Sequence, residues 1–143
     1  MYDDLNEKYF NYKLPLDVEL YYNPKIMRCG GRCFIGRDLK IEISKKYIDR
    51  FGILEIKPIL LHEMIHLMYP NHKKEFMEEV KRLKNFGEDV PLRVNGYCNW
   101  VYRCEDCGSR IIRMIRMPLW GFEKVCCKLC GGDVIEEDVR NVV

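Results

Sequence analysis

The sequence predicts an α+β fold, in which a small antiparallel sheet packs on helices and a smaller cysteine-bearing unit follows. Residues 16–22 and 39–43 each alternate apolar and polar side chains, which is the period of a half-buried strand. Between residues 56 and 86 the apolar side chains instead recur at the three- and four-residue spacing of helices. Beyond residue 96, two pairs of cysteines with C-x-x-C spacing indicate a unit of different character.

The N-terminal segments are predicted to form one helix and three strands. Residues 3–12 place apolar side chains on one side of a short helix. Residues 25–34 lie between the two alternating segments and contain Gly30 and Gly31. We expect three antiparallel strands with glycine-bearing turns, one at this pair and one at Gly36.

Three further helices follow from their start and stop signals. Ser44 can cap a short helix that Gly52 ends. Pro58 suits the first turn of the next helix. Pro70 stops that helix, because proline donates no backbone hydrogen bond and pushes the preceding residue toward an extended conformation. The last helix is expected over residues 73–86.

All three histidines of the chain lie within eleven residues, and two of them belong to an H-E-x-x-H motif. Positions i and i+4 share one helix face, so His62 and His66 can hold a zinc ion while Glu63 stands beside the attacking water as general base. The turn at Pro70 can swing His72 back over the helix as a third ligand, which leaves the fourth position open for catalysis. An isolated H-E-x-x-H pattern also arises by chance on amphipathic helices, but the third histidine favours a catalytic zinc site.

The cysteine pairs have the spacing of a structural zinc site with four thiolate ligands. The predicted ligands are Cys104, Cys107, Cys127 and Cys130. We place a zinc ribbon over residues 96–143 and a separate domain over residues 1–95. The chain is therefore expected to hold two zinc ions, one catalytic and one structural.

The remaining cysteines leave open alternatives. Cys126 could replace Cys127 in the ribbon site, although the C-x-x-C spacing favours Cys127. Cys29, Cys33 and Cys98 have no assigned role. Small buried hydrophobic side chains are a simpler interpretation of them than a third metal site.

A stretch of the ribbon without acidic residues, 108–121, combines basic and aromatic side chains. The candidates for nucleic-acid contact are Arg110, Arg113, Arg116 and Trp120. Such residues suit single or frayed strands, through phosphate charge and base stacking. A spacing of three does not keep the arginines on one face of a regular strand, so a solvated hairpin stays an equal alternative.

With these segments in order, the chain resembles the SprT-like zinc metalloprotease family, the group that includes Spartan. The resemblance covers nearly the whole chain and rests on these motifs: Leu5-Asn6-Glu7-Lys8-Tyr9-Phe10 with Leu14-Pro15, Arg28-Cys29-Gly30-Gly31-Arg32-Cys33, Ile41-Glu42-Ile43-Ser44, Leu61-His62-Glu63-Met64-Ile65-His66, His72 with Phe76, and the ribbon. The short spacing to the third histidine is similar to that of WLM-type proteases. The resemblance implies that residues 1–95 are a zincin-like SprT-like metalloprotease domain. It also implies a DNA-associated endopeptidase that cuts proteins crosslinked to DNA, a role in DNA repair.

The residues alone support only a zinc-dependent hydrolase, and two other functions stay open. One is a non-catalytic DNA-binding scaffold with a vestigial protease domain; an intact Glu63 argues against it, since a scaffold needs no general base. The other is a regulatory protease with a protein partner. The acidic N-terminus carries no signal peptide, and no apolar run reaches the ~20 residues of a membrane span. We therefore expect a cytoplasmic protein, with association with the nucleoid left open.

Overall fold

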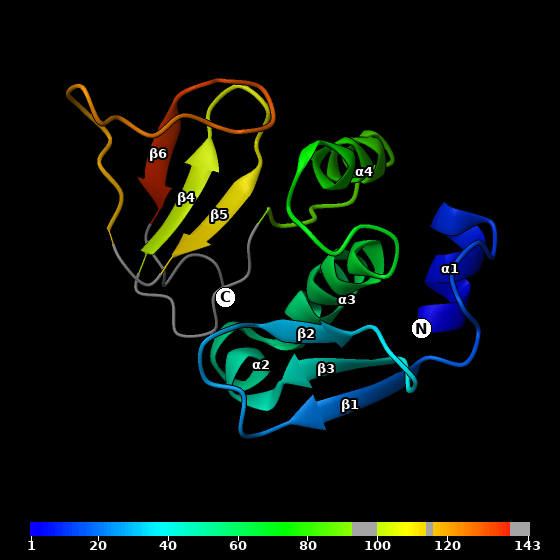
Figure 1. Ribbon diagram of the computed structural model, residues 1–143. Helices are drawn as coiled ribbons and strands as arrows, with labels where there is room; N and C mark the ends of the chain where they lie inside the picture. Colours follow the sequence, from blue (N-terminus) through cyan, green and yellow to red (C-terminus); the bar gives the residue numbers. More distant parts are fainter. Residues whose placement is uncertain (93–99, 114–115, 138–143) are drawn as a thin grey trace.

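The computed structural model describes residues 1–92, 100–113 and 116–137, and it shows four α-helices and two small sheets in this part of the chain (Figure 1). The elements are α1 (Tyr2–Phe10), β1 (Glu19–Asn23), β2 (Gly31–Phe34), β3 (Lys40–Ser44), α2 (Lys45–Phe51), the 3-10 helix η1 (Ile53–Glu55), α3 (Ile56–His66), α4 (Lys74–Asn85), β4 (Trp100–Cys104), β5 (Arg110–Arg113) and β6 (Val134–Glu137). The mixed α+β class is confirmed. Among the described residues, no helix has the length and apolar character needed to cross a membrane.

The first sheet has the strand order β1-β3-β2 and is mixed, so the expectation of a purely antiparallel sheet was wrong. β2 and β3 form the expected antiparallel hairpin, with Cys33 opposite Ile41. β1 instead runs parallel to β3, with Leu20 opposite Ile41. After β1 the chain crosses to the other edge of the sheet and forms β2 there. β3 then takes the position between β1 and β2. Alternation reveals which face a side chain occupies, but neither the direction nor the partner of a strand.

The predicted helix signals are confirmed at both ends of α2. The Ser44 hydroxyl accepts a hydrogen bond from the backbone amide of Tyr47 at 3.2 Å, which caps the helix. Gly52 ends it with a φ of 100°, a conformation that favours glycine. α4 also lies where expected, with Phe76, Val80 and Leu83 buried along one face.

α3 is a buried helix between the first sheet and α4. It contacts β2, β3 and α4, and its apolar residues Ile59, Leu60 and Leu61 are all buried although they point in different directions. A helix that is apolar around most of its circumference belongs inside the protein. His62 and Glu63 are therefore buried on this helix, and only its first turn, at Lys57 and Pro58, and its last residue, His66, are partly exposed.

The C-terminal ribbon, meaning β4 to β6 with their connecting loops, forms an antiparallel sheet of order β5-β4-β6. Ile111 of β5 lies opposite Tyr102 of β4, and residues 114 and 115 lie outside the described residues. Gly108 and Gly131 take φ values of 71° and 77° in the turns that follow the cysteine pairs. The predicted domain boundary at 95/96 also lies outside the described residues, so it stays a prediction.

Candidate metal centres

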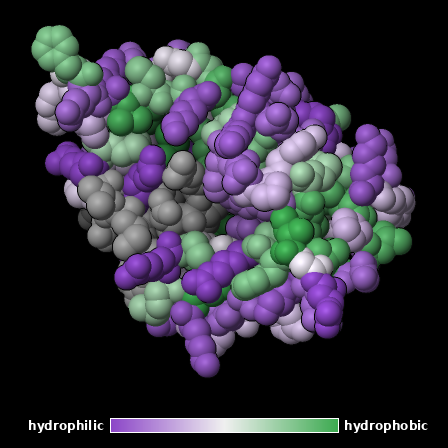
Figure 2. Space-filling view, in the orientation of Figure 1, coloured by the Kyte–Doolittle hydropathy of each residue, from purple (hydrophilic) through white to green (hydrophobic). Residues whose placement is uncertain are grey.

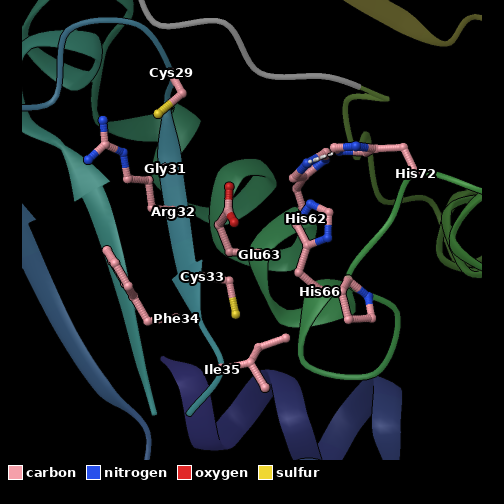
Figure 3. A pocket seen from close by; sticks show the side chains of 11 residues that line it. Cys29, Gly31, Arg32, Cys33, Phe34, Ile35, His62, Glu63, His66 and His72 are labelled. Carbon is pink, nitrogen blue, oxygen red and sulfur yellow. Dashed lines mark hydrogen bonds between the residues drawn. The ribbon is translucent and has the colours of Figure 1, made fainter. Parts of the chain in front are cut away.

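The structure brings the three histidines together at the end of α3 (Figure 3). α3 places His62 and His66 one turn apart, and the turn through Pro70 returns His72 beside them. Their ligand nitrogens lie within 4.8 Å of one another. The Nε2 atoms of His62 and His72 are 3.1 Å apart. A tetrahedral zinc with Zn–N bonds of 2.0–2.1 Å separates its nitrogens by about 3.3 Å, so the cluster fits such an ion.

Backbone carbonyls orient two of the imidazole rings. Nδ1 of His62 lies 2.7 Å from the carbonyl oxygen of Pro91, and Nδ1 of His66 lies 3.1 Å from that of Tyr69. A carbonyl only accepts, so each Nδ1 donates and each Nε2 keeps its lone pair for a metal. Burial also lowers the pKa of His66, which favours the neutral ring that binds metal.

Phe76 on α4 forms the floor of the histidine cluster. Its ring centroid lies 4.9 Å from that of His62, 4.7 Å from that of His66 and 4.7 Å from that of His72, and its side chain is fully buried. From the sequence, helical spacing indicated only that Phe76 belongs to the core. Its position four residues after His72 was the one local signal of contact with the histidines.

Glu63 lies between β2 and the histidines, in the same cavity (Figure 3). Its side chain is buried, and burial raises the pKa of its carboxyl group to about 8. A carboxyl group whose pKa lies near neutral pH, beside a metal site, can both accept and release a proton, which suits it to proton transfer.

The cavity has a volume of about 460 Å³ and lies between β2 and the end of α3. Cys29 and Cys33 line it from the β2 side and are half-buried, so they are not fully buried core residues as the simpler interpretation expected. Burial, with a contribution from the charge of Glu63, raises the pKa of Cys33 to about 12. In the described part of the chain neither thiol belongs to a group of potential metal ligands, and Cys98 lies outside that part.

The four predicted ribbon cysteines also converge. Their sulfur atoms lie within 4.8 Å of one another in the group Cys104, Cys107, Cys127 and Cys130. Two sulfur pairs are 3.4 Å and 3.6 Å apart, close to the ~3.8 Å expected around a tetrahedral zinc with Zn–S bonds of 2.3 Å. The amide of Gly132 points at the Cys130 sulfur from 3.4 Å. Cys126 is exposed and outside the group, so the structure assembles the register with Cys127.

Hydrogen bonding at Cys107 favours a thiolate. Burial alone would raise the pKa of Cys107, but hydrogen bonds with Ser109, Cys130 and Cys127 outweigh it and bring the pKa to about 6. Burial raises the pKa of Cys127 to about 12, so Cys107 is the thiol of the group that most readily loses its proton. Thiolates are the form of cysteine that binds zinc. The Cys₄ group and the His₃ group are thus two potential metal sites of different chemistry, consistent with zinc at both.

The structure separates the residues predicted to contact nucleic acid. Arg110 is buried and donates two hydrogen bonds to Glu55, so it does not reach the surface as expected. Arg113 is half-buried on β5. Arg116 is exposed, lies over the ring of Trp100 and forms an ion pair with Glu136.

Trp120 lies on the surface with 74 % of its area exposed, and Phe122, two residues later, is fully exposed. Figure 2 shows a hydrophobic side chain projecting at the upper left, the corner where Figure 1 draws the loop between β5 and β6. Hydrophilic side chains cover much of the rest of this face (Figure 2). The candidate surface therefore consists of Arg116, Trp120 and their loop, without Arg110.

Comparison with known proteins gives a consistent family match. The model of the SprT-like family matches residues 1–96. A "Protein SprT-like" of Lysinibacillus sphaericus is 30% identical over 134 residues, which cover 85% of this chain and 86% of the relative. The protein of the same name from Staphylococcus saprophyticus is 25% identical over 142 residues, with 94% of this chain and 90% of the relative covered. That of Streptococcus sanguinis is 27% identical and covers 80% of each chain.

Proposed function

Because the chain belongs to the SprT-like family, we propose that it is a zinc-dependent endopeptidase that acts on proteins bound or crosslinked to DNA. The observation that carries the catalytic part is the convergence of His62, His66 and His72 on one point, with Glu63 buried in the same cavity. The three histidines without Glu63, or a buried glutamate without the histidines, would not indicate hydrolysis. Three neutral nitrogen ligands together with an adjacent base form the machinery of metal-assisted hydrolysis.

In the proposed peptide-bond hydrolysis, the histidines, Glu63 and two backbone carbonyls have different roles. A zinc ion held by the three histidines would supply Lewis-acid activation of the water and of the scissile carbonyl. Glu63 accepts the proton of the attacking water on its carboxylate and then delivers it to the nitrogen of the leaving amine. The carbonyls of Pro91 and Tyr69 keep the histidine rings in the orientation that binds the ion.

β2 supports an extended peptide as the substrate. It is an outer strand of its sheet, and it lines the cavity that holds Glu63 and the histidines. An outer strand offers backbone groups to which an extended peptide can add as a further strand. The exposed side chains of Arg32 and Phe34 on β2 would lie at the edge of this path.

The DNA part of the proposal is supported by the exposed loop of the C-terminal ribbon. Trp120 offers a stacking surface, and Arg116 offers a positive charge near it in the sequence. Such a pair of groups suits single or frayed strands with little sequence preference.

The test is a cleavage assay with the full zinc-loaded chain and the variant Glu63→Gln. The substrates are one protein offered free, crosslinked to single-stranded DNA and crosslinked to double-stranded DNA. We expect cleavage by the wild type, faster on the DNA-linked protein, and a loss of about 10²–10⁴ in rate for Glu63→Gln with its zinc retained. Glu75→Gln makes the same chemical change at an exposed position of α4 and should leave the rate unchanged.

Each outcome separates the alternatives. Near-normal cleavage by Glu63→Gln would remove Glu63 from the mechanism. A zinc-loaded wild type that binds DNA but cleaves no substrate would favour the scaffold. Cleavage without any effect of DNA would favour a protease that responds to a protein partner.

A further inference from the structure

The histidine cluster depends on a backbone group outside the helix that carries it. Nδ1 of His62 is held by the carbonyl of Pro91, which follows α4 and precedes the C-terminal ribbon. His62 is 3% exposed, and Val90 and Leu92 on either side of Pro91 are buried to the same degree. The position of the Pro91 carbonyl therefore depends on the contacts that residues 90–92 make with the rest of the protein.

The ribbon holds this segment. The amide of Leu92 lies 3.4 Å from the carbonyl of Arg110, the first residue of β5. Leu92 and Ile111 line the same small cavity between α4 and the ribbon. Two residues before Arg110, Gly108 ends the turn that begins with the first cysteine pair.

The side chain of Arg110 reaches the start of α3. Its two terminal nitrogens donate to the two carboxylate oxygens of Glu55 at 2.9 Å and 3.0 Å, and both side chains are less than a tenth exposed. Glu55 ends η1, and Ile56 begins α3, which carries His62, Glu63 and His66. A bidentate pair of this kind fixes orientation as well as distance.

We propose that Arg110 is a positioning residue for the histidine cluster and makes the metal affinity of that cluster depend on the docked ribbon. Its side chain holds the start of α3, while its carbonyl holds the segment whose Pro91 oxygen orients His62. Loss of the side chain leaves the Glu55 charge buried without its partner, so α3 and β5 move apart. The Pro91 carbonyl then leaves His62, and the ring loses its fixed tautomer and direction. This inference rests on the zinc role proposed above for the histidines.

The test measures zinc affinity at each site of the full chain by competition with a chelator. For Arg110→Gln we expect zinc binding at the histidines to weaken by about 10–100-fold, the usual effect of removing an outer partner of a metal ligand. The ribbon should keep one zinc per chain. In protein without metal at the histidines, the Nδ1 proton of His62, followed by NMR, should exchange with water faster than in the wild type.

Two further variants make the result specific. Arg82→Gln removes an arginine–glutamate pair that lies within α4 and should leave both affinities unchanged. Glu55→Leu combined with Arg110→Met replaces the buried pair by apolar side chains, which often preserves folding. This double variant should fold, but it lacks the bidentate pair that fixes α3 against β5, so its histidines should bind zinc more weakly than those of the wild type. If Arg110→Gln does not fold, the double variant tests the positioning role in its place.

The outcomes distinguish this inference from the proposed function. A wild type without zinc at the histidines would reject the proposed function itself. A wild type that binds zinc there, beside a folded Arg110 variant with unchanged affinity and unchanged His62 exchange, would reject the positioning role. An equal loss in Arg82→Gln would also reject it.

Discussion

Gly31 lies directly against Glu63. A Cβ atom at position 31 would fall 3.0 Å from both Cγ and Oε1 of Glu63, and 2.9 Å from Cγ2 of Ile59. Carbon contacts this short are not tolerated in a packed interior, because repulsion rises steeply below normal van der Waals separation. Glycine is therefore what allows β2 to pass so close to α3. The glycine sets the position of the outer strand and of the proposed general base relative to each other.

We expect Gly31→Ala to lower the rate of the proposed hydrolysis while zinc stays bound. The added methyl group must push Glu63 or β2 aside, and misplacement of a reacting group by about 1 Å can cost up to about 100-fold in rate. Gly36→Ala is the matched control, since a Cβ there meets nothing within 4 Å. The measurements are kcat on a model protein substrate and zinc content. An unchanged kcat in Gly31→Ala would show that the close approach has no catalytic role.

We expect the wild type to contain two zinc ions per chain and His72→Ala to contain one. The histidine site would lose one of its three ligands, whereas the four ribbon cysteines are unaffected. Cys126→Ser should keep both ions, because Cys126 lies outside the sulfur group. Elemental analysis of purified protein measures the count. One zinc in the wild type, or the same count in His72→Ala, would contradict the proposed ligand set.

Glu63→Gln should stabilise the protein that lacks metal at the histidines, and the gain should grow with pH. Burial raises the folded-state pKa of Glu63 to about 8, above its usual value of 4.5. Between these values the unfolded chain has released the proton and the folded chain still holds it, so wild-type stability falls as pH rises, until about pH 8.

Glutamine does not titrate, and the stability advantage of the variant should increase by about 2 kcal/mol between pH 6.5 and pH 9, at about 1.4 kcal/mol per pKa unit. Urea unfolding at the two pH values measures the difference, with ribbon zinc content checked in each sample. A pH-independent difference between variant and wild type would show that Glu63 titrates normally.

Trp120→Ala should weaken binding to single-stranded DNA at every salt concentration, because stacking is worth ~1–3 kcal/mol per base. Arg116→Ser should instead flatten the salt dependence, because one phosphate contact and its released counterion are lost. Leu54→Ala removes a large apolar side chain of η1 that is also exposed, and it serves as control. Fluorescence anisotropy with a labelled oligonucleotide measures all three variants. Wild-type affinity and salt dependence in both ribbon variants would show that this loop is not the DNA contact.

The local parts of the site could be predicted from the sequence by itself. The four-residue spacing of His62 and His66, the cap at Ser44 and the C-x-x-C pairs depend on neighbours within one helical turn or one tight turn. Pro70 acts the same way, since it ends a helix whatever surrounds it. These features determined the class of fold, both candidate ligand sets and the proposed general base.

Only the tertiary structure decided the features that join distant segments. The direction of β1, the partner of Arg110 and the carbonyl that orients His62 each depend on residues far away in the chain. An alternating pattern shows which side of a strand is buried, and an arginine in sequence shows only a charge. Whether that charge meets phosphate or a buried carboxylate depends on which surfaces pack together, and packing is a property of the whole folded chain. For this reason Arg110, predicted at the DNA surface, lies in the interior against Glu55.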